Sequence, residues 1–240
     1  MIRITQAQGK TYGVVGLGKS GRATVASLLA SGAQVVAWDD GEAGRNAAQK
    51  EFSNLTIKPL ENWDVGELAA VVMSPGIMLS HPAVVAAEKA GVEVIGDIEL
   101  LYRAQPSARY VGITGTNGKS TTTTLIAHIL KACGKRVEVG GNLGTPALAL
   151  APLDAEGIYV LELSSYQLDL VRTTKFDVAL LLNISPDHLD HHGSMENYIA
   201  AKMHIFDRMT KDDVAVVGVD DAVSVGIADT LSGIRVVRIS

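Results

Sequence analysis

The segment from Ile113 to Thr121 contains the residue types that bind a nucleoside triphosphate. It reads Ile-Thr-Gly-Thr-Asn-Gly-Lys-Ser-Thr, so that a glycine-rich turn is followed directly by Lys119 and Ser120. Backbone N–H groups of such a turn can bind phosphate oxygens, the lysine can neutralise the β- and γ-phosphates, and the hydroxyl can bind Mg²⁺. The general P-loop pattern G-x-x-x-x-G-K-[ST] requires glycine at Ile113. The segment is therefore a phosphate loop of a particular type.

Three further groups could complete a magnesium–triphosphate site. Glu162 ends an apolar run, where an acid can bind Mg²⁺ or simply face solvent. The segment 183–192 is dense in histidine and aspartate, but it has no cysteine and no His-x-x-x-His spacing. A polar loop is therefore favoured over a zinc site there. Lys202 lies in a predicted helix, where a lysine by itself is usually a solvated surface group.

A second glycine-rich turn occurs about a hundred residues earlier, at Gly16-x-Gly18-x-x-Gly21. It follows an apolar run and opens a predicted helix, and Asp39 ends the next apolar run. These features are typical of a dinucleotide site. Their chemistry requires only a diphosphate at a helix N-terminus and a diol near an acid. A UDP-linked sugar meets these requirements as well as NAD does, and a tight turn without a ligand is also possible.

Strand and helix patterns alternate along the chain, which predicts an α/β fold with parallel sheets. The predicted strands are 12–15, 34–38, 69–73, 92–95, 110–114, 158–163, 176–182, 214–219 and 235–239. The predicted helices are one that follows the turn 16–21 and ends at about 31, and those at 81–90, 97–103, 120–131 and 194–209. The pattern restarts after a linker at 104–107. We therefore predict an N-terminal Rossmann-like domain over 1–97 and a P-loop-type α/β domain over 98–240.

The composition excludes several classes of protein. Of 240 residues, 47% are hydrophobic and 20% charged, which is ordinary for a globular protein. The net charge of −5 offers no electrostatic footprint for nucleic acid. The one cysteine, Cys133, cannot form an intramolecular disulfide, and we expect it to be a small core residue late in a helix. No signal peptide or membrane-spanning run is visible, so a cytoplasmic monomer without membrane contact is expected.

Several motifs together resemble the Mur ligases, ATP-dependent amide-bond-forming enzymes of peptidoglycan synthesis. The motifs shared with the family, in the family's order, are Thr114–Thr121, Gly141-Asn142-Leu143-Gly144, Glu162–Gln167 and Asp187-His188-Leu189-Asp190. Further motifs, at 16–21, Ser74-Pro75-Gly76-Ile77 and Gly96–Leu100, narrow the resemblance to the branch that adds D-glutamate to UDP-N-acetylmuramoyl-L-alanine.

The resemblance implies roles for individual residues. The ATP-binding residues would be Gly115, Thr116, Asn117, Gly118, Lys119, Ser120 and Thr121. The Mg²⁺ ligands would be Ser120, Glu162, His188 and Lys202, the last as a carbamate formed with CO₂. Lys119, Glu162, His188 and Lys202 would be catalytic. The substrate-binding residues would be Leu17, Gly18, Lys19, Ser20, Asp39, Ser74, Pro75, Gly76, Asn142, Ser164 and His188.

The implied reaction joins D-glutamate to the alanyl carboxylate through an acyl phosphate, with release of ADP. Two departures from the family pattern stand out. Asp40-Gly41 replaces a polar residue and an arginine beside the uracil or diphosphate. The family also has three domains, so we expect a truncated chain that lacks the third domain, with little or no ligase activity. The alternatives are a sister ligase, a folylpolyglutamate-type enzyme, a nucleotide-sugar-binding module and an NAD-linked dehydrogenase.

Overall fold

The computed structural model describes residues 1–240, and the contacts within the chain divide it into two compact units. Unit 1 comprises Met1–Ala104 together with Pro146–Pro152 and Leu170–Arg172. Unit 2 comprises Gln105–Thr145, Leu153–Asp169 and Thr173–Ser240. None of the helices combines the length and the apolar character that crossing a bilayer requires. The functional boundary expected between residues 97 and 98 stays a prediction.

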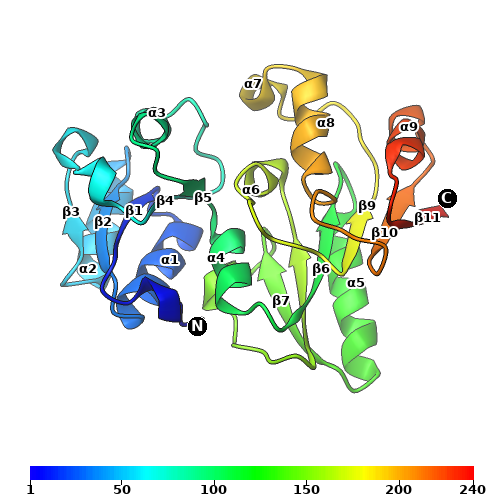
Figure 1. Ribbon diagram of the computed structural model, residues 1–240, viewed down its shortest axis with the longest axis horizontal. Helices are drawn as coiled ribbons and strands as arrows, with labels where there is room; N and C mark the ends of the chain where they lie inside the picture. Colours follow the sequence, from blue (N-terminus) through cyan, green and yellow to red (C-terminus); the bar gives the residue numbers. More distant parts are fainter. The chain divides into compact units, whose positions relative to one another are not determined.

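Unit 1 contains a five-stranded, wholly parallel sheet in the order β3-β2-β1-β4-β5 (Figure 1). Its strands are β1 (Thr11–Val15), β2 (Gln34–Trp38), β3 (Thr56–Ile57), β4 (Ala70–Met73) and β5 (Val94–Ile95). Its helices are α1 (Lys19–Ala30), α2 (Glu42–Glu51), α3 (Pro82–Lys89) and α4 (Asp97–Ala104). The first strand lies in the middle of the sheet, so the turn that follows β1 lies between the turns that follow β2 and β4.

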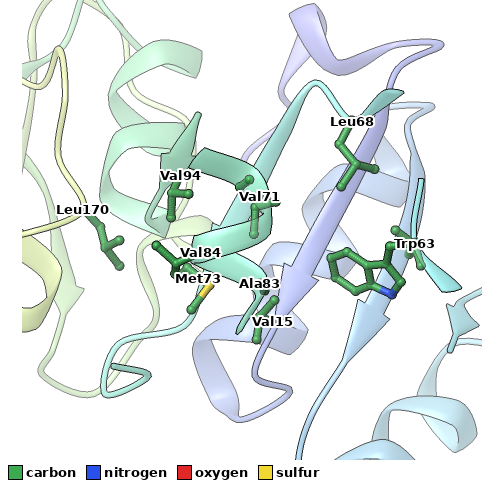
Figure 2. Close-up of a cluster of buried hydrophobic side chains, with 11 residues drawn as sticks. Val15, Trp63, Leu68, Val71, Met73, Ala83, Val84, Val94 and Leu170 are labelled. Carbon is green, nitrogen blue, oxygen red and sulfur yellow. The ribbon is translucent and has the colours of Figure 1, made fainter. Parts of the chain in front are cut away.

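The core of unit 1 explains why these strands read as apolar runs. Val71 and Met73 of β4 and Val15 of β1 are almost completely buried. Figure 2 shows them packed with Val84 of α3 and with Trp63 from the segment before β4. A parallel sheet that is buried on both faces needs apolar residues at successive positions, rather than at alternate ones.

Unit 2 contains a six-stranded parallel sheet in the order β11-β10-β9-β6-β8-β7. Its strands are β6 (Arg109–Thr114), β7 (Arg136–Gly141), β8 (Gly157–Glu162), β9 (Val178–Leu181), β10 (Val214–Gly218) and β11 (Arg235–Ile239). Its helices are α5 (Lys119–Ala132), α6 (Ser165–Leu168), α7 (Leu189–His192), α8 (Met195–Met203) and α9 (Ala222–Thr230). Helix α5 packs on β6, β7 and β8, whereas α6 and α7 contact α8 (Figure 1).

The strand order places the ends of three strands next to one another in unit 2. Strand β6 comes first in the chain but lies between β8 and β9. The loop after β6 therefore emerges between the loops that follow β8 and β9. In open α/β sheets, this point of reversed strand order is where ligands bind, at the carboxyl ends of the strands.

The predicted α/β fold with parallel sheets is confirmed, but two local expectations were wrong, and some elements, among them β7, α2 and α9, were not predicted. The helix predicted to end at 209 ends at Met203, because Ile205 and Phe206 enter tighter turns that bury their side chains. Strand β7 was missed, since it is an edge strand with only two valines separated by a glutamate. Cys133 is exposed, not buried, because it follows the last turn of α5 and its N–H caps that helix.

Candidate functional site

The phosphate-loop residues form the turn between β6 and α5. Gly118 precedes the first residue of α5 and has φ +82°, a left-handed conformation that a residue with a Cβ rarely adopts. No side chain caps this helix end. The first backbone N–H groups of a helix carry partial positive charge and have no partner within the helix. The helix therefore begins with donors suited to an anion, at the position that the sequence predicted.

The segment after β9 holds the loop in place. The N–H of Thr116 donates to the carbonyl of Asn183 at 3.0 Å, and the N–H of Asn117 donates to Oδ1 of Asn183 at 2.9 Å. The hydroxyl of Thr116 donates to the carbonyl of Ser185 at 3.1 Å and accepts from the N–H of the same residue at 3.0 Å. It also lies 3.0 Å from the hydroxyl of Tyr198. These contacts fix the loop in its shape before any ligand is bound.

Glu162 forms side-chain hydrogen bonds with residues of two other sequence motifs, the phosphate loop and the segment 141–144. The Ser120 hydroxyl donates to one of its carboxylate oxygens at 2.6 Å, and the Asn142 side-chain amide donates to the other at 2.7 Å. The side chain of Glu162 is only 3% exposed. The sequence left open whether Glu162 faces solvent or binds a metal ion. In the structure the residue is buried next to the phosphate loop. Its carboxylate and the hydroxyl form a pair of oxygen ligands of the kind that Mg²⁺ prefers.

Two lysines approach the same loop from different elements. Lys119 begins α5, and its Nζ donates to the carbonyls of Gly115 and Thr116 at 2.9 and 2.8 Å. Lys202, near the end of α8, donates from its Nζ to the same Gly115 carbonyl at 3.0 Å and also contacts the hydroxyl of Thr114 at 3.4 Å. Composition and spacing alone do not link the two lysines, which are far apart in the chain, and only the family resemblance placed both of them at one site.

Lys202 is a buried group and not a solvated one. Only 2% of it is exposed, and its Nζ lies 4.6 Å from the centre of the Tyr198 ring. Burial lowers the pKa of this amine to about 7, and the nearby charge of Lys119 acts in the same direction. Asp187 acts weakly against them. A substantial fraction of this lysine is therefore an uncharged amine near pH 7.

His188 lies in the same region but does not contact the lysines or Glu162. Its backbone is left-handed, with φ +53°, and its side chain is half exposed. Its Nε2 lies 3.5 Å from a carboxylate oxygen of Asp187, and its ring lies 5.1 Å from that of Tyr166. His188 is the only non-glycine residue in the chain with positive φ, a conformation that costs energy and is often found at functional sites.

Two further histidines end the short helix α7. The Nε2 of His192 lies 2.9 Å from the hydroxyl of Ser165, and its Nδ1 lies 3.8 Å from a carboxylate oxygen of Asp169. The ring of His191 packs against that of Tyr166 in a tilted arrangement, with 4.1 Å between ring centres. Burial lowers the pKa of both imidazoles, that of His192 to about 4, so both are neutral at pH 7.

In unit 1, the first glycine-rich turn is tied to Asp39. One carboxylate oxygen of Asp39 accepts from the N–H of Leu17 at 2.5 Å, and the other accepts from the N–H of Gly41 at 2.8 Å. Gly21 packs so closely on the Gly16 carbonyl that a Cβ there would overlap it. The turn thus joins the carboxyl ends of β1 and β2 tightly, and its glycines are required by packing.

The remaining predicted substrate residues lie near these turns. Ser74 follows β4 and donates from its hydroxyl to the carbonyl of Gly16 at 2.8 Å, and Pro75 and Gly76 continue the same turn. Gly18 and Lys19 form the beginning of α1, with Ser20 as its second residue. Ser164 caps α6, where its hydroxyl accepts from the N–H of Gln167. Thr121 lies exposed in the first turn of α5.

Sequence reasoning missed three residues that shape these sites. Asn183 and Tyr198 both form hydrogen bonds with the phosphate loop. The available signals were that Asn183 directly follows a predicted strand and that Tyr198 lies on the predicted helix that carries Lys202. Arg45 stacks over Trp38 at 4.6 Å and donates to the carbonyls of Asp39 and Asp40. It supplies a cation near the position where the expected arginine is replaced by Gly41. The short separation of Arg45 from Asp39 in the sequence was the available sign that this cation lies near the end of β2.

Comparison with known proteins gives a consistent result over the whole chain. The profile described as Mur ligase middle domain matches residues 113–240, and that described as Mur ligase MurD-like, N-terminal domain, matches residues 10–96. UDP-N-acetylmuramoylalanine–D-glutamate ligase from Paramagnetospirillum magneticum is 49% identical over 100% of this chain and 53% of its own length. The ligase of the same name from Rhodospirillum rubrum is 50% identical over 100% of this chain and 52% of its length. The chain therefore spans about half the length of these relatives.

Solved structures share the fold at much lower identity. The UDP-N-acetylmuramate:L-alanyl-γ-D-glutamyl-meso-diaminopimelate ligase from Neisseria meningitides has a TM-score of 0.65 at 15% identity, covering 95% of this chain and 77% of that one. The MurF ligase from Thermotoga maritima, solved in complex with ADP, has a TM-score of 0.51 at 18% identity, covering 85% and 47%. At these identities, the likeness shows the fold alone.

Proposed function

This chain belongs to the Mur ligase family, and we propose that its two units carry the UDP-sugar and ATP sites of a ligase that adds D-glutamate to UDP-N-acetylmuramoyl-L-alanine. Such a reaction forms one amide bond of a peptidoglycan precursor and consumes ATP in the cytoplasm. The relatives that match along the whole chain bear the name of this activity. Because the chain spans about half their length, the whole reaction is proposed for an enzyme that contains these units.

One observation carries the proposal: Glu162 is held between Ser120 and Asn142 beside the phosphate loop. The two hydrogen bonds fix the orientation of this buried carboxylate, so that it is positioned to bind a cation. Ser120 and Glu162 would hold a Mg²⁺ ion shared with the triphosphate, since they offer oxygen atoms at the start of α5 and at the end of β8. The ion would offset the negative charge of the phosphates.

The loop itself supplies the phosphate ligands. The N–H groups around Gly118 begin α5 without a side-chain cap, and Lys119 lies folded over the loop with both of its hydrogen bonds to backbone carbonyls. An arriving triphosphate offers Lys119 an anionic acceptor in place of these carbonyls, and charge-assisted hydrogen bonds are the stronger ones. We assign ATP binding to Gly115–Thr121 on this basis.

Lys202 fits the carbamate role that the family implies. Its neutral amine can attack CO₂, forming an N–C bond and releasing one proton to solvent, which gives an anionic carbamate. The reaction requires the neutral amine, which is present near pH 7 because the group is buried close to Lys119. The carbamate oxygens and His188 would hold a second Mg²⁺ ion near the substrate carboxylate. Lys119 would help to stabilise the charge of that carboxylate as it meets the γ-phosphate and forms an acyl phosphate, which the amine of D-glutamate then attacks.

For the UDP-sugar we propose the first glycine-rich turn of unit 1. The beginning of α1, including Leu17, Gly18, Lys19 and Ser20, would bind the diphosphate, with Asp39 close to the nucleoside. Arg45 adds a positive charge at the end of β2. The family implies further contacts from Ser74–Gly76, Asn142, Ser164 and His188, and we retain these residues as substrate-binding proposals.

Calorimetry on this chain tests the binding sites directly. We expect UDP-N-acetylmuramoyl-L-alanine to bind, and a non-hydrolysable ATP analogue to bind in a Mg²⁺-dependent manner that Lys119→Ala weakens by about tenfold or more. Lys131→Ala, an exposed lysine in the last turn of α5, is the matched control. Binding of NADH without binding of the UDP-sugar would instead support a dehydrogenase and refute the proposal.

A substrate screen tests the reaction and its specificity. ATP and UDP-N-acetylmuramoyl-L-alanine are supplied with D-glutamate, L-lysine, meso-diaminopimelate or glycine, and phosphate and ligated product are measured. We expect an enzyme that contains these units to form product with D-glutamate and with none of the other three amino acids. Product with another amino acid would identify a sister ligase, and binding without turnover in every arm would favour a nucleotide-sugar-binding module. Light scattering on the same samples tests the expected monomer.

A further inference from the structure

The two histidines at the end of α7 take no part in the proposed ATP and UDP-sugar sites. The family motif includes Asp187, His188 and Asp190, but it gives no role to His191 and His192. These side chains nevertheless meet Asp169 at the end of α6, and one ligand atom from each of the three residues lies within 4.8 Å of the other two. A pair of imidazoles with one carboxylate is a ligand set used by transition metals in proteins.

We propose that Asp169, His191 and His192 form a site for a transition-metal dication such as Zn²⁺, separate from the magnesium sites, that fastens α7 to α6. Ligands of one tetrahedral zinc ion lie roughly 3.4 Å apart when the metal–ligand bonds are about 2.0–2.2 Å. The Nδ1 of His192 and the carboxylate oxygen of Asp169 are already 3.8 Å apart. Only small side-chain rotations would complete the set, with solvent filling the open position.

The surroundings of His192 resemble those of a metal ligand. Its Nε2 is engaged with the hydroxyl of Ser165 at 2.9 Å, which leaves Nδ1 facing Asp169. Histidine ligands commonly bind the metal through one ring nitrogen and hold a hydrogen-bond partner with the other, which orients the ring. The side chain of His192 is only 4% exposed and that of Asp169 only 14%, so these two ligands are already fixed by packing.

The chemistry of the ligands selects against Mg²⁺. Two imidazole nitrogens with a single carboxylate favour zinc, copper, nickel or iron, whereas Mg²⁺ favours sites in which most of the ligands are oxygen atoms. The site is thus distinct in its metal from the one assigned to Ser120 and Glu162.

A metal here would act on His188 through the backbone. His188 immediately precedes α7 in a left-handed conformation, and α7 has only four residues. The imidazole of His188 lies near the carboxylate of Asp187 and near the ring of Tyr166, which also contacts both His191 and His192. Fastening the end of α7 to Asp169 would limit the movement of this short segment, and with it the position of His188.

Zinc titration of the whole chain tests the site, with Cys133→Ser in every sample to remove the exposed thiol. We expect one equivalent of Zn²⁺ to bind and an excess of Mg²⁺ not to displace it. His191→Ala, His192→Ala and Asp169→Asn should each weaken binding by more than about tenfold, and Ser165→Ala by about tenfold. His204→Ala, which alters a half-exposed histidine paired with Asp207, is the control and should leave the affinity unchanged.

Two outcomes would overturn the proposal. One is zinc affinity that depends on His188 or His204 but not on His191 and His192. The other is no binding of zinc by the folded chain. Because a variant could fail to fold, circular dichroism is recorded for each, and X-ray absorption of the zinc-loaded chain with all histidines intact counts the imidazole ligands directly. Two imidazoles are expected, and a count of none would refute the site. The ATP and UDP-sugar titrations are independent of this result.

Discussion

The side-chain nitrogens of Lys119 and Lys202 donate to the same carbonyl oxygen, that of Gly115, at 2.9 and 3.0 Å. Two ammonium groups on one acceptor repel each other, and the more deeply buried of them releases its proton more easily. That group is Lys202, whose pKa falls to about 7. Two lysines therefore contact the phosphate loop through one carbonyl, and a substantial fraction of Lys202 is an uncharged, reactive amine near pH 7.

Lys202 should make the stability of the chain depend on pH. Its pKa is about 7 in the folded protein, against an ordinary value of 10.5. Between these values the unfolded chain binds a proton that the folded protein does not, so the free energy of unfolding rises with pH from about 7 to about 10.5. Below pH 7, the cost of the buried ammonium is fully present. Lys202→Met should therefore stabilise the chain most at pH 6.

The measurement is the difference in free energy of unfolding between Lys202→Met and the unaltered chain, taken from urea titrations at several pH values. The advantage of the variant should shrink as pH rises from 7 to 10, by up to about 1.4 kcal/mol per pH unit. Lys131→Met, an exposed position on α5, should show no such trend. A constant difference across this range would contradict the expected titration of Lys202.

Asn142 should matter to magnesium through Glu162. Its amide donates to one carboxylate oxygen at 2.7 Å, so Asn142→Ala leaves the carboxylate held by Ser120 alone. We expect Mg²⁺-dependent binding of an ATP analogue to weaken about tenfold, as for loss of other groups that orient metal ligands. Glu162→Gln should remove most of the Mg²⁺ dependence. Calorimetry at two Mg²⁺ concentrations checks both, with the exposed Asn54→Ala as control; equal affinities for Asn142→Ala and the unaltered chain would count against this role.

Thr116 should be important for the shape of the phosphate loop. Its hydroxyl contacts both backbone groups of Ser185 and the hydroxyl of Tyr198. Thr116→Val keeps the volume but leaves these groups without their partner, so we expect a loss of about 1–3 kcal/mol in the free energy of unfolding. Thr124→Val is the matched control, because this exposed hydroxyl only contacts the carbonyl of Ser120 within its own helix. Similar losses for the two variants, measured in urea, would show that the Thr116 contacts do not stabilise the loop.

Gly21 should tolerate no side chain. An added Cβ would overlap the backbone carbonyl of Gly16, which cannot move without displacing the turn between β1 and α1. Gly21→Ala should therefore lower the free energy of unfolding by about 1–3 kcal/mol and weaken binding of the UDP-sugar. At Gly66 the same substitution meets open space, so Gly66→Ala should have little effect on either quantity. Normal sugar binding by a folded Gly21→Ala variant would remove the first turn from the proposed site.

Much of the fold could be predicted from the sequence because parallel strands buried on both faces are continuous apolar runs. The run 34–38 became β2 with the same bounds, and the runs at 12–15 and 69–73 lie within one residue of β1 and β4. The edge strand β7 was missed for the opposite reason, since an edge strand has fewer buried positions. The end of α8 was also missed, because burial of Ile205 and Phe206 outweighed the helical pattern.

The sequence by itself determined where the phosphate loop lies, since glycine, lysine and serine at this spacing can form a turn that begins a helix. It also gave the order of the family's motifs. Only the tertiary structure decided which distant groups surround the loop. Lys202 looks like a solvated residue in the sequence, and it is buried against the Gly115 carbonyl because the strand order brings the segments after β9 back to the end of β6. The pKa of an amine depends on its burial and on the charges around it, and those are properties of the folded chain.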